Sequence, residues 1–257
     1  MIYVTGSSGF LGKHLLKALG SNVKRIPHKE IPTIKLKPFD YFYFLSTYGN
    51  MASHTDSDKI IQANVLDLIH IAKQLPRLDF KSFVFVSTSS VKLPMQTMYS
   101  RTKRMAEELL LSFIEKYKLP ICVIQPFSIT GVGEQGEHLI PTLIRSCLEK
   151  EMVNFVPKPC HDFIDVEDVV SGMLTLSKLS VKGMFELGSG TKYSNEEVLK
   201  IVEKVTGKKA NINLVGQMRM YDNQNWVSNN YRARGYGWLP TKKLEDSIKE
   251  MYEATKK

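Results

Sequence analysis

The chain has 257 residues, of which 43% are hydrophobic and 24% are charged. This ordinary globular composition excludes a disordered or fibrous protein, and the length fits one large α/β domain or two small ones. No run of about 18 apolar residues occurs, so no membrane span is expected. The N-terminus lacks the basic region of a signal peptide. Three scattered cysteines neither build a disulfide framework nor space like zinc ligands. We therefore expect a cytoplasmic protein without a metal site.

The net charge of +9 raises the question of nucleic-acid binding. Residues 1–128 hold 17 Lys and Arg against nine Asp and Glu, whereas residues 129–257 hold 18 against 17. No run of five or more basic residues occurs, and no basic segment is interleaved with aromatic residues. An anionic small ligand of the N-terminal half explains the charge more simply, so no nucleic-acid partner is expected.

Apolar runs alternate with helical patterns through the first half of the chain. Strands are predicted at 2–5, 23–26, 41–46, 83–86 and 121–124, and helices at 12–19, 60–72 and 105–117. Strands that are apolar throughout and separated by helices indicate a parallel sheet covered on both faces. The predicted fold is therefore α/β, with a doubly wound parallel sheet of the Rossmann type.

The pattern loosens after Pro126. Helices are predicted at 141–149, 166–179, 195–206 and 241–254, with one strand at 184–187. No repeat, low-complexity tract or linker separates the two halves. We predict a dinucleotide-binding domain at residues 1–128, with its sheet completed by segments around 160–190, and a smaller substrate-binding lobe at 129–257.

A glycine-rich loop follows the first strand and opens the first helix. Gly6, Gly9 and Gly12 have the spacing at which one glycine makes a tight turn, one admits a pyrophosphate and one lets helix and strand pack closely. The helix N-terminus then offers free N–H groups to phosphates. Loops collect glycine for many reasons, but this position favours dinucleotide binding. The predicted cofactor-binding residues of this loop are Gly6, Ser8, Gly9, Phe10, Leu11 and Gly12.

The end of the second strand normally selects the cofactor. An acidic side chain there accepts the adenosine ribose hydroxyls of NAD, whereas a cation accommodates the phosphate of NADP. The strand ends with Arg25-Ile26-Pro27-His28-Lys29. His28 and Lys29 favour NADP(H), although they could form only a solvated turn. NAD(H) stays an alternative, because Glu30 follows closely.

Tyr99 and Lys103 lie four residues apart at the start of a predicted helix and share one face. The pKa of tyrosine is ordinarily about 10, and a nearby ammonium together with an oxidised nicotinamide lowers it. The pair then becomes a general acid and base near neutral pH. Such a pair also arises by chance. The strand at 83–86, however, runs directly into hydroxyl residues 87–90, at the edge where an α/β sheet presents ligand groups.

Nearly the whole chain resembles the extended short-chain dehydrogenase/reductases, the NAD(P)-dependent nucleotide-sugar epimerase/dehydratase group. The segments that carry the resemblance are TGSSGFLG, Asn64-Val65, VSTSSV followed by Tyr99-Ser100-Arg101-Thr102-Lys103, Gln125-Pro126-Phe127-Ser128, residues 161–169 (HDFIDVEDV), Phe185–Gly190 and Gly235–Pro240. So many matches in the same order make coincidence implausible.

The resemblance implies a catalytic triad in which Thr88 holds the substrate oxygen, Tyr99 donates or accepts the proton, and Lys103 binds the nicotinamide ribose. It implies further cofactor-binding residues at Leu45, Ser46, Thr47, Asn64, Ser87, Pro126 and Phe127. Substrate-binding residues are implied at Thr88, Ser89, Ser128, His161 and Arg219. For Arg219 the alternative is a solvated surface arginine. For Asn64 the alternative is a buried, satisfied polar group.

The sequence departs from the family pattern at four places. Only about a dozen residues separate the second and third strands, so a helix and a strand on the adenosine side are missing. Thr88 and Tyr99 are 11 residues apart, about half the usual spacing. Gln125 and His161 stand where the family has arginines. Ser89 and Ser90 replace the Asp-Glu pair of sugar 4,6-dehydratases, which argues against a dehydratase.

The predicted function is NAD(P)H-dependent reduction of a nucleotide-linked 4-keto sugar. The alternative is a nucleotide-sugar 4-epimerase that retains NAD. A non-catalytic dinucleotide-binding or RNA-associated protein is less consistent with an intact triad. We also expect a homodimer, because the resembled family pairs the helix that contains Asn64 and the helix that follows Tyr99 with their copies. Both helices carry wide apolar stripes, which include Ile61, Leu68, Leu109 and Phe113.

Overall fold

The computed structural model describes residues 1–51, 53–216 and 225–256. The chain divides into two compact units. The first comprises Met1–Pro126, Val170–Glu186 and Arg232–Trp238, and the second comprises Phe127–Val169, Leu187–Tyr231 and Leu239–Lys257. The chain therefore returns to the first unit twice after leaving it at Pro126. The assignment of cofactor binding to one unit and substrate binding to the other stays a prediction.

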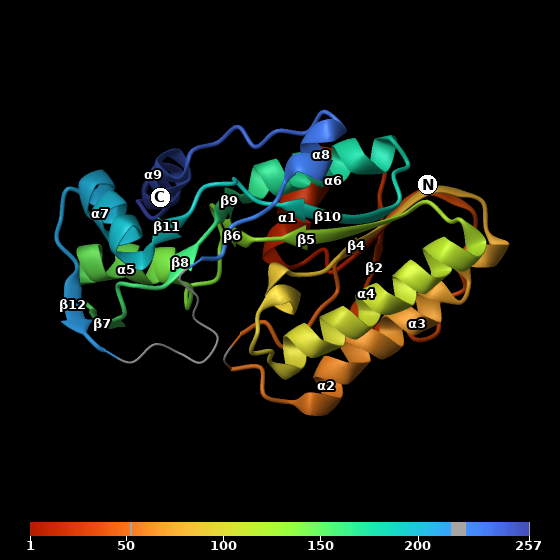
Figure 1. The fold of residues 1–257 in the computed structure, drawn as a ribbon, viewed down its shortest axis with the longest axis horizontal. Coiled ribbons are helices and arrows are strands. Elements are labelled where there is room, and N and C mark those ends of the chain that lie inside the picture. Colours follow the sequence, from red (N-terminus) through yellow and green to blue (C-terminus); the bar gives the residue numbers. More distant parts are fainter. Residues whose placement is uncertain (52, 217–224, 257) are drawn as a thin grey trace. The chain divides into compact units, whose positions relative to one another are not determined.

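The first unit contains a six-stranded sheet in the order β10-β5-β4-β3-β1-β2 (Figure 1). Its strands are β1 (Ile2–Thr5), β2 (Lys24–Ile26), β3 (Phe39–Phe44), β4 (Phe80–Val86), β5 (Ile121–Pro126) and β10 (Gly183–Leu187). β1 pairs in parallel with β2 and β3, and β4 pairs in parallel with β3 and β5. The doubly wound parallel sheet predicted from the sequence is confirmed.

Helices cover both faces of this sheet because its strands are apolar on both sides. The surrounding helices are α1 (Phe10–Leu19), α2 (Ser57–Ile61), a π-helical turn (Gln62–Leu66), α3 (Asp67–Ala72), α4 (Met98–Tyr117), α6 (Val166–Lys178) and α8 (Tyr231–Gly235). Phe42 and Phe83 point to the face where Leu68 of α3 and Leu110 of α4 complete the core. Tyr43 alternates to the other face, where its hydroxyl lies 2.7 Å from Ser177 of α6.

β2 is the edge strand, and only a short connection joins it to β3. This connection forms one 3₁₀ turn (His28–Glu30) and then runs without regular structure to Phe39. Two side chains of the α3 region hold it: His70 Nε2 lies 2.9 Å from the Ile34 carbonyl, and Gln74 binds the Ile34 carbonyl and the Leu36 N–H. Among the described residues, no strand lies beyond β2 where six-stranded dinucleotide folds have one, as the short spacing predicted.

The single helix predicted at 60–72 is interrupted by the π-helical turn at Gln62–Leu66. Asn64 lies in this turn and is fully buried. A π-helical turn inserts an extra residue and often occurs at functional sites. Apolar periodicity gave no sign of the interruption, because the side chains on both sides of the turn still face the sheet.

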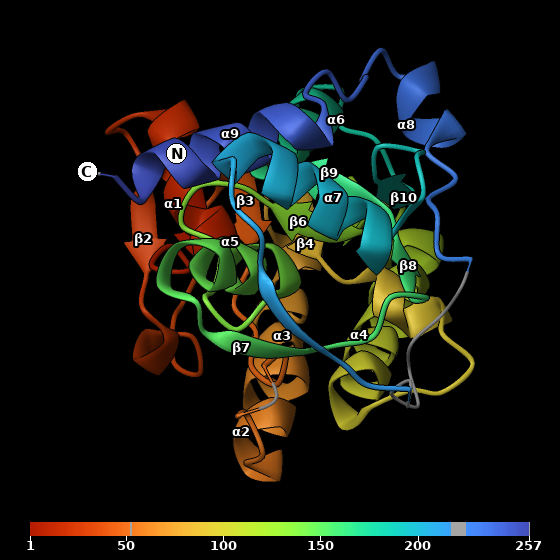
Figure 2. The same cartoon turned by 90° about the vertical axis from the view of Figure 1, so that its left-hand side faces the viewer.

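The second unit is built on α5 (Leu139–Glu149), α7 (Asn195–Thr206) and α9 (Leu244–Ala254), which face the viewer in Figure 2. Leu143, Val198 and Ile248 form part of the core that these helices share. Three small sheets accompany them: β6 (Ser128–Thr130) with β9 (Phe163–Asp165), β7 (Met152–Phe155) with β12 (Asn211–Leu214), and β8 (Cys160–His161) with β11 (Tyr193–Ser194). None of these strands was predicted from the sequence, because two to four residues are too short for a periodic pattern.

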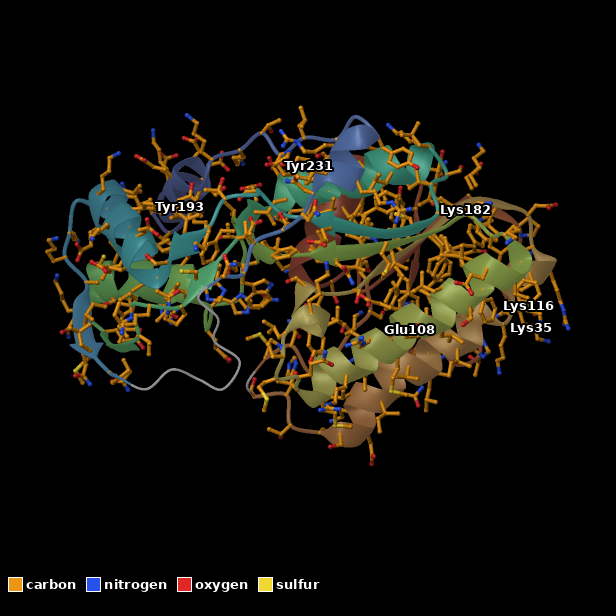
Figure 3. All side chains as sticks on the ribbon, in the orientation of Figure 1. Lys35, Glu108, Lys116, Lys182, Tyr193 and Tyr231 are labelled. Carbon is orange, nitrogen blue, oxygen red and sulfur yellow. The ribbon has the colours of Figure 1, made fainter. Side chains whose placement is uncertain are left out.

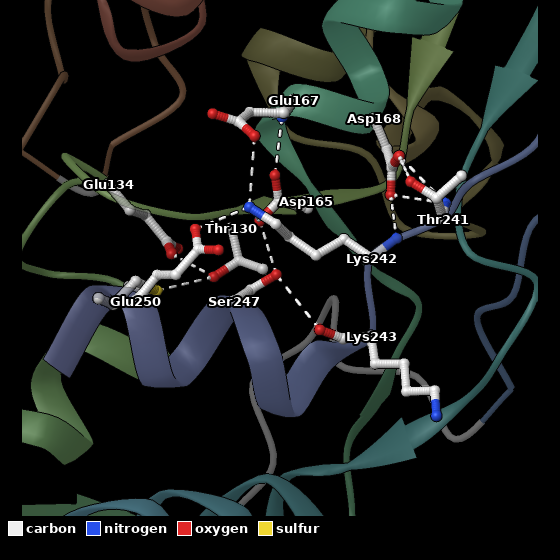
Figure 4. A network of polar contacts seen from close by, with 11 residues as sticks. Thr130, Glu134, Asp165, Glu167, Asp168, Thr241, Lys242, Lys243, Ser247 and Glu250 are labelled. Carbon is white, nitrogen blue, oxygen red and sulfur yellow. Dashed lines mark hydrogen bonds and ion pairs between the residues drawn. The ribbon is translucent and has the colours of Figure 1, made fainter. Parts of the chain in front are cut away.

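A network of charged side chains secures the start of α9 within the second unit (Figure 4). Lys242 Nζ lies 2.7 Å from Glu250, 3.4 Å from Glu167 and 3.5 Å from Asp165. These carboxylates hold the pKa of Lys242 above its usual value. The Asp168 carboxylate accepts the backbone N–H groups of Thr241 and Lys242. The segment 161–169 therefore contains three acidic residues with a structural role in the second unit: Asp165, Glu167 and Asp168.

Candidate cofactor and catalytic site

The glycine loop is fixed to the carboxyl end of β3. Thr5 Oγ1 accepts hydrogen bonds from the N–H groups of Leu45 (3.0 Å) and Ser46 (3.1 Å). Gly6 has φ +64°, and a Cβ on it would lie 2.7 Å from the backbone of Leu45. A Cβ on Gly12 would lie 2.2 Å from the Gly6 carbonyl oxygen. Both positions therefore require glycine for close backbone approach.

The loop presents an open helix N-terminus. α1 begins at Phe10, and its N-cap residue Gly9 contributes no side-chain hydrogen bond. The first-turn N–H groups and the positive end of the helix dipole are therefore free to meet an anion. The loop lies between β1 and β3, where the strand order of the sheet reverses, which is where α/β folds bind nucleotides. The six loop residues predicted to bind the cofactor form this feature together.

The phenol of Tyr99, in the first turn of α4, has the hydroxyls of Thr47 and Thr88 as polar neighbours, and both act to lower its pKa. Thr88 follows β4, and its Oγ1 accepts from the Ser90 N–H at 3.2 Å. Burial raises the pKa of Tyr99 to about 12, because it disfavours the phenolate more than the two hydroxyls favour it. The structure thus brings the predicted acid–base residue and its predicted hydroxyl partner together, with the phenol in its protonated form.

Lys103 lies one turn after Tyr99 and is 1% exposed. Its Nζ donates a 2.6 Å hydrogen bond to the Val86 carbonyl and lies 4.2 Å from the centre of the Phe85 ring. Burial lowers the pKa of Lys103 to about 7, and the charge of Glu107 partly opposes this shift. The lysine is therefore held beside the end of β4, with a neutral form accessible near neutral pH.

Glu107 is a buried carboxylate that the sequence reading missed. It is 4% exposed and accepts a 2.8 Å hydrogen bond from Gln125 Nε2. Burial raises the pKa of Glu107, while Gln125 and Lys103 act in the opposite direction. Its position four residues after Lys103 was the available signal, since residues at that spacing share a helix face. Gln125 thus supplies a neutral donor where the family motif has an arginine.

Asn64 joins the segment after β3 to α4. Its Oδ1 accepts from Thr47 Oγ1 (2.9 Å) and from the Tyr48 N–H (3.0 Å). Its Nδ2 donates to the Tyr48 carbonyl (2.9 Å) and to Thr102 Oγ1 (3.0 Å). All four hydrogen-bonding capacities of the amide are used. Asn64 is thus a buried, satisfied group that also fixes Thr47 beside Tyr99; its predicted contact with a cofactor stays a prediction.

At the end of β2, His28 contacts a carboxylate that the sequence reading did not consider. His28 Nδ1 lies 3.0 Å from Asp67 Oδ2, while the His28 side chain is 58% exposed and Asp67 is fully buried. Lys29 and Glu30 are exposed. Burial raises the pKa of Asp67, and its contacts with Gln62 and His28 oppose that shift.

The remaining predicted residues of the first unit lie near the ends of its strands. Leu45 and Ser46 are buried after β3, Ser87 and Ser89 are buried after β4, and Pro126 ends β5. Ser89 opens a 3₁₀ turn (Ser89–Lys92), which contains no acidic residue.

Three predicted residues belong to the second unit. Ser128 Oγ lies 3.5 Å from His161 Nδ1. The rings of His161 and Phe127 lie 5.6 Å and 6.2 Å from the Trp226 ring. Arg219, the other predicted substrate-binding residue, lies outside the described residues.

The neighbouring Asp162 has a structural role in the second unit. Its fully buried carboxylate accepts from the backbone and hydroxyl of Ser189, from the Gly190 N–H, and from the backbone and hydroxyl of Ser228. These bonds fix the turn after β10 and the segment around Ser228 to the strand pair that carries His161.

The described residues hold no cluster of three His, Cys, Asp or Glu arranged to bind a metal ion. Within the same part of the chain, no helix combines the length and the apolar character needed to cross a bilayer.

The model of the NAD dependent epimerase/dehydratase family matches residues 31–188, which is more than half of the chain. The chain belongs to this family. It is therefore an enzyme of the oxidoreductase type, of the extended short-chain dehydrogenase/reductase family. The match begins after the glycine loop, whose role thus rests on the geometry described above.

Relatives in this family include epimerases and dehydratases. The chain is 21% identical to an uncharacterized UDP-glucose epimerase, YtcB, of Bacillus subtilis (strain 168), over 96% of the chain and 95% of that protein. It is 23% identical to a UDP-glucose 4-epimerase of Rhizobium leguminosarum bv. trifolii, over 85% of the chain and 78% of that protein. It is 22% identical to the dTDP-D-glucose 4,6-dehydratase of Dictyostelium discoideum, over 80% of the chain but only 62% of that enzyme.

Solved structures of family members share the fold. MoeE5 in complex with UDP-glucose and NAD has a TM-score of 0.88 at 23% identity, over 99% of this chain and 98% of that one. RMD from Pseudomonas aeruginosa complexed with NADPH has a TM-score of 0.83 at 19% identity, over 98% of this chain and 96% of that one. Family members with this fold therefore bind either nicotinamide cofactor.

Proposed function

We propose that this family member reduces the keto group of a nucleotide-linked 4-keto sugar with NAD(P)H, in the cytoplasm. The observation that carries the proposal is the position of the Tyr99 phenol, which burial keeps protonated, beside the hydroxyls of Thr47 and Thr88 that follow β3 and β4. A group in that state is ready to donate a proton. Reduction of a ketone requires one proton for its oxygen and one hydride for its carbon, and the nicotinamide supplies that hydride when it is bound.

The glycine loop fits a dinucleotide. Gly6 and Gly12 leave space that a Cβ would fill, and α1 opens without a side-chain cap, so a pyrophosphate could approach the backbone closely. NADP(H) is the favoured cofactor because His28 and Lys29 follow β2, with NAD(H) as the alternative. Ser87 and Phe127 are proposed to contribute further contacts to the cofactor, and Asn64 is proposed to act indirectly, through Thr47.

Each triad residue has a distinct role in the proposed reaction. Thr88 hydrogen bonds the keto oxygen and polarises it, and Tyr99 donates its proton to that oxygen as negative charge develops. Lys103 binds the nicotinamide ribose and, when charged, stabilises the phenolate that remains on Tyr99. Because burial brings the pKa of Lys103 to about 7, its charge depends on what binds beside it.

The turn after β4 favours reduction over dehydration. Ser89 is buried, and Ser90 Oγ lies 3.0 Å from Thr88 Oγ1. Elimination of water from a sugar needs an acid and a base at this turn, and serine hydroxyls are poor in both roles near neutral pH. In the second unit, Ser128, His161 and Arg219 are proposed to bind the nucleotide diphosphate of the substrate.

The test is oxidation of NADPH and of NADH by the purified protein with a panel of nucleotide-linked 4-keto sugars, followed by identification of the product. We expect one molecule of NADPH to be oxidised for each sugar reduced. Tyr99→Phe should keep the fold and the affinity for cofactor but lower turnover by roughly 10²–10⁴-fold, the usual contribution of a positioned acid or base. Full activity in that variant would remove Tyr99 from the mechanism.

A 4-epimerase is the second candidate, and the names of two relatives, from Bacillus subtilis and Rhizobium leguminosarum, favour it. An epimerase would use the same triad and return the hydride to the opposite face of the sugar. It would convert a nucleotide sugar with no net oxidation of added cofactor, and the purified protein would carry NAD. The shortened β2–β3 connection favours a cofactor that exchanges, and therefore the reductase.

A further inference from the structure

A buried carboxylate lies beneath the residues that follow β2. Asp67, the first residue of α3, is fully buried, and its Oδ1 accepts a 2.6 Å hydrogen bond from Gln62 Nε2. Its Oδ2 lies 3.0 Å from His28 Nδ1. Apart from that contact, Oδ2 has no hydrogen-bond partner among the residues that the structure describes. An unpaired buried carboxylate is costly, so the interaction with His28 is expected to matter energetically.

This pair lies where dinucleotide-binding sheets distinguish the two cofactors. Ile26, the last residue of β2, is level with Thr5 in the parallel pair, so the turn that begins at Pro27 is next to the glycine loop. In such folds the residue at the end of the second strand contacts the 2′ position of the adenosine ribose. Because β2 is the edge strand, His28 is not covered and stays 58% exposed.

We propose that Asp67 and His28 together select the cofactor by its 2′ group, binding the 2′-phosphate of NADP(H) when the imidazole is protonated and a free 2′-hydroxyl when it is neutral. The inference rests on the proposed function, because it requires the adenosine end of the cofactor to lie beside the glycine loop. It assigns to Asp67 a role in specificity that acts through His28.

The chemistry follows from the two ring nitrogens. The contact with Asp67 keeps a hydrogen on Nδ1 and fixes the orientation of the ring, so that Nε2 is the nitrogen available to a ligand. On the protonated ring Nε2 carries a hydrogen and donates to a phosphate oxygen in a charge-assisted bond. On the neutral ring Nε2 has a lone pair that accepts from a hydroxyl but offers nothing to a fully ionised phosphate.

Other charged groups near Asp67 and His28 also influence the binding of a phosphate. Lys29 and Glu30 belong to the same turn, and Lys24 and Arg25 are exposed on β2. His70 of α3 also acts electrostatically on Asp67, and its Nε2 lies 2.9 Å from the Ile34 carbonyl. These charged groups are unchanged when His28 is replaced by glutamine, so their effect on a phosphate is the same with and without the imidazole. The change in selectivity is therefore expected to come from the imidazole.

The experiment measures the dissociation constants of NAD⁺ and NADP⁺ by calorimetry between pH 5.5 and 8.5, for wild type, His28→Gln and Asp67→Asn. The ratio of the NAD⁺ constant to the NADP⁺ constant should fall roughly tenfold in wild type as pH rises, the size of one charge-assisted hydrogen bond. The 2′-phosphate itself titrates near pH 6, and because this contribution is common to all variants, His28→Gln reports it alone. The part of the decrease that is due to His28 is the difference between wild type and His28→Gln. Asp67→Asn should lose most of that part.

The matched control is Lys35→Ala, which removes an exposed charge from the same connection (Figure 3) and should leave the pH dependence unchanged. A ratio with the same pH dependence in wild type and His28→Gln would overturn the inference while leaving the proposed function intact. Failure of both nucleotides to bind at any pH would overturn both. Nitrogen-15 NMR of the His28 ring gives a readout independent of cofactor, since it should show the hydrogen on Nδ1 in wild type but not in Asp67→Asn.

Discussion

Tyr99 has two threonine neighbours, and they differ in what their hydroxyls can do for it. Thr47 donates its own hydrogen to Asn64 Oδ1, so its oxygen is free to accept the phenol hydrogen of Tyr99. Thr88 Oγ1 accepts from the Ser90 N–H and lies 3.0 Å from Ser90 Oγ, so its hydrogen can be donated to Ser90, to Tyr99 or to a substrate oxygen. The Thr47 hydroxyl thus offers the phenol an acceptor before any substrate binds, and a polar group already in place favours catalysis.

Thr47→Val should therefore lower turnover by roughly threefold to tenfold, because one neutral hydrogen bond contributes about 0.5–1.5 kcal/mol. The side chains have nearly the same shape, so the Michaelis constant and the fold should change little. Steady-state kinetics of Thr47→Val and Thr47→Ser provide the measurement. Serine restores the hydroxyl and should recover most of the activity; equal loss in both variants would show that shape, and not the hydroxyl, matters at this position.

Burial of Lys103 is expected to make the free energy of unfolding rise with pH. Its pKa is about 7 in the folded chain against an ordinary value of 10.5. Between these values the unfolded chain binds a proton that the folded chain does not, so the free energy of unfolding should rise with pH across that window. Lys103→Met removes this term and should be more stable than wild type at pH 7 by roughly 2–4 kcal/mol, while losing activity.

Urea denaturation of Lys103→Met and wild type at pH 7 and pH 10 provides the test. The difference between the two should shrink as pH rises, because wild type no longer has to release a proton on folding. Lys103→Arg is the control, since an arginine stays charged in this range and should be less stable than wild type at both pH values. A less stable Lys103→Met at pH 7 would show that the Val86 and Phe85 contacts outweigh the cost of burial.

The sequence predicted the triad because its residues are recognisable by spacing and by position after a strand. It did not reveal Asp67 or Glu107 as part of the site. Each occupies one position of an amphipathic helix, and only tertiary packing shows that the position is buried and which partner meets it. Pairing between His28 and Asp67 joins residues 39 positions apart, and no local pattern encodes such a contact.

At the scale of elements, long periodic helices were predicted closely and short pieces were not. The helix predicted at 195–206 has those bounds in the structure, with the capping box of Ser194 and Glu197 at its start. The helix at 105–117 begins earlier, at Met98, because Thr97 caps it with its side chain. The short strands of the second unit and the π-helical turn depend on tertiary contacts, so the sequence pattern alone could not predict them.

The β2–β3 connection depends on α3 for its conformation, and Gln74 carries most of that interaction. Gln74→Leu should lower the free energy of unfolding by about 1–3 kcal/mol, because the Leu36 N–H then loses its acceptor in a buried position. Urea denaturation measures the loss, and amide hydrogen exchange should increase at residues 34–38. Lys73→Leu is the matched control: it adds the same apolar side chain at the neighbouring exposed position and should change stability by less than about 0.5 kcal/mol.

At the scale of the whole molecule, the homodimer stays a prediction, and the structure changes the argument for it. Leu68 is fully buried in the core, and Phe113 packs against that core. These two residues of the predicted stripes therefore face the sheet and are not available to a partner. Ile61 of the predicted stripes is 38% exposed, and the other exposed large apolar residues of the two helices are Leu66 (47%), Met98 (37%), Met105 (59%) and Tyr117 (42%).

Met105→Glu tests whether this surface pairs with a second copy. α4 packs along α3 and the π-helical turn, and its exposed side also carries charged residues such as Glu108 and Lys116 (Figure 3). Burying a new carboxylate in an apolar interface without a partner is strongly unfavourable, so the variant should sediment as a monomer at micromolar concentration where wild type sediments as a dimer. Leu179→Glu, at the end of α6 and 54% exposed, introduces the same side chain on the other face of the sheet and should stay dimeric. A monomeric wild type would refute the homodimer, and a dimer unaffected by Met105→Glu would place the interface elsewhere.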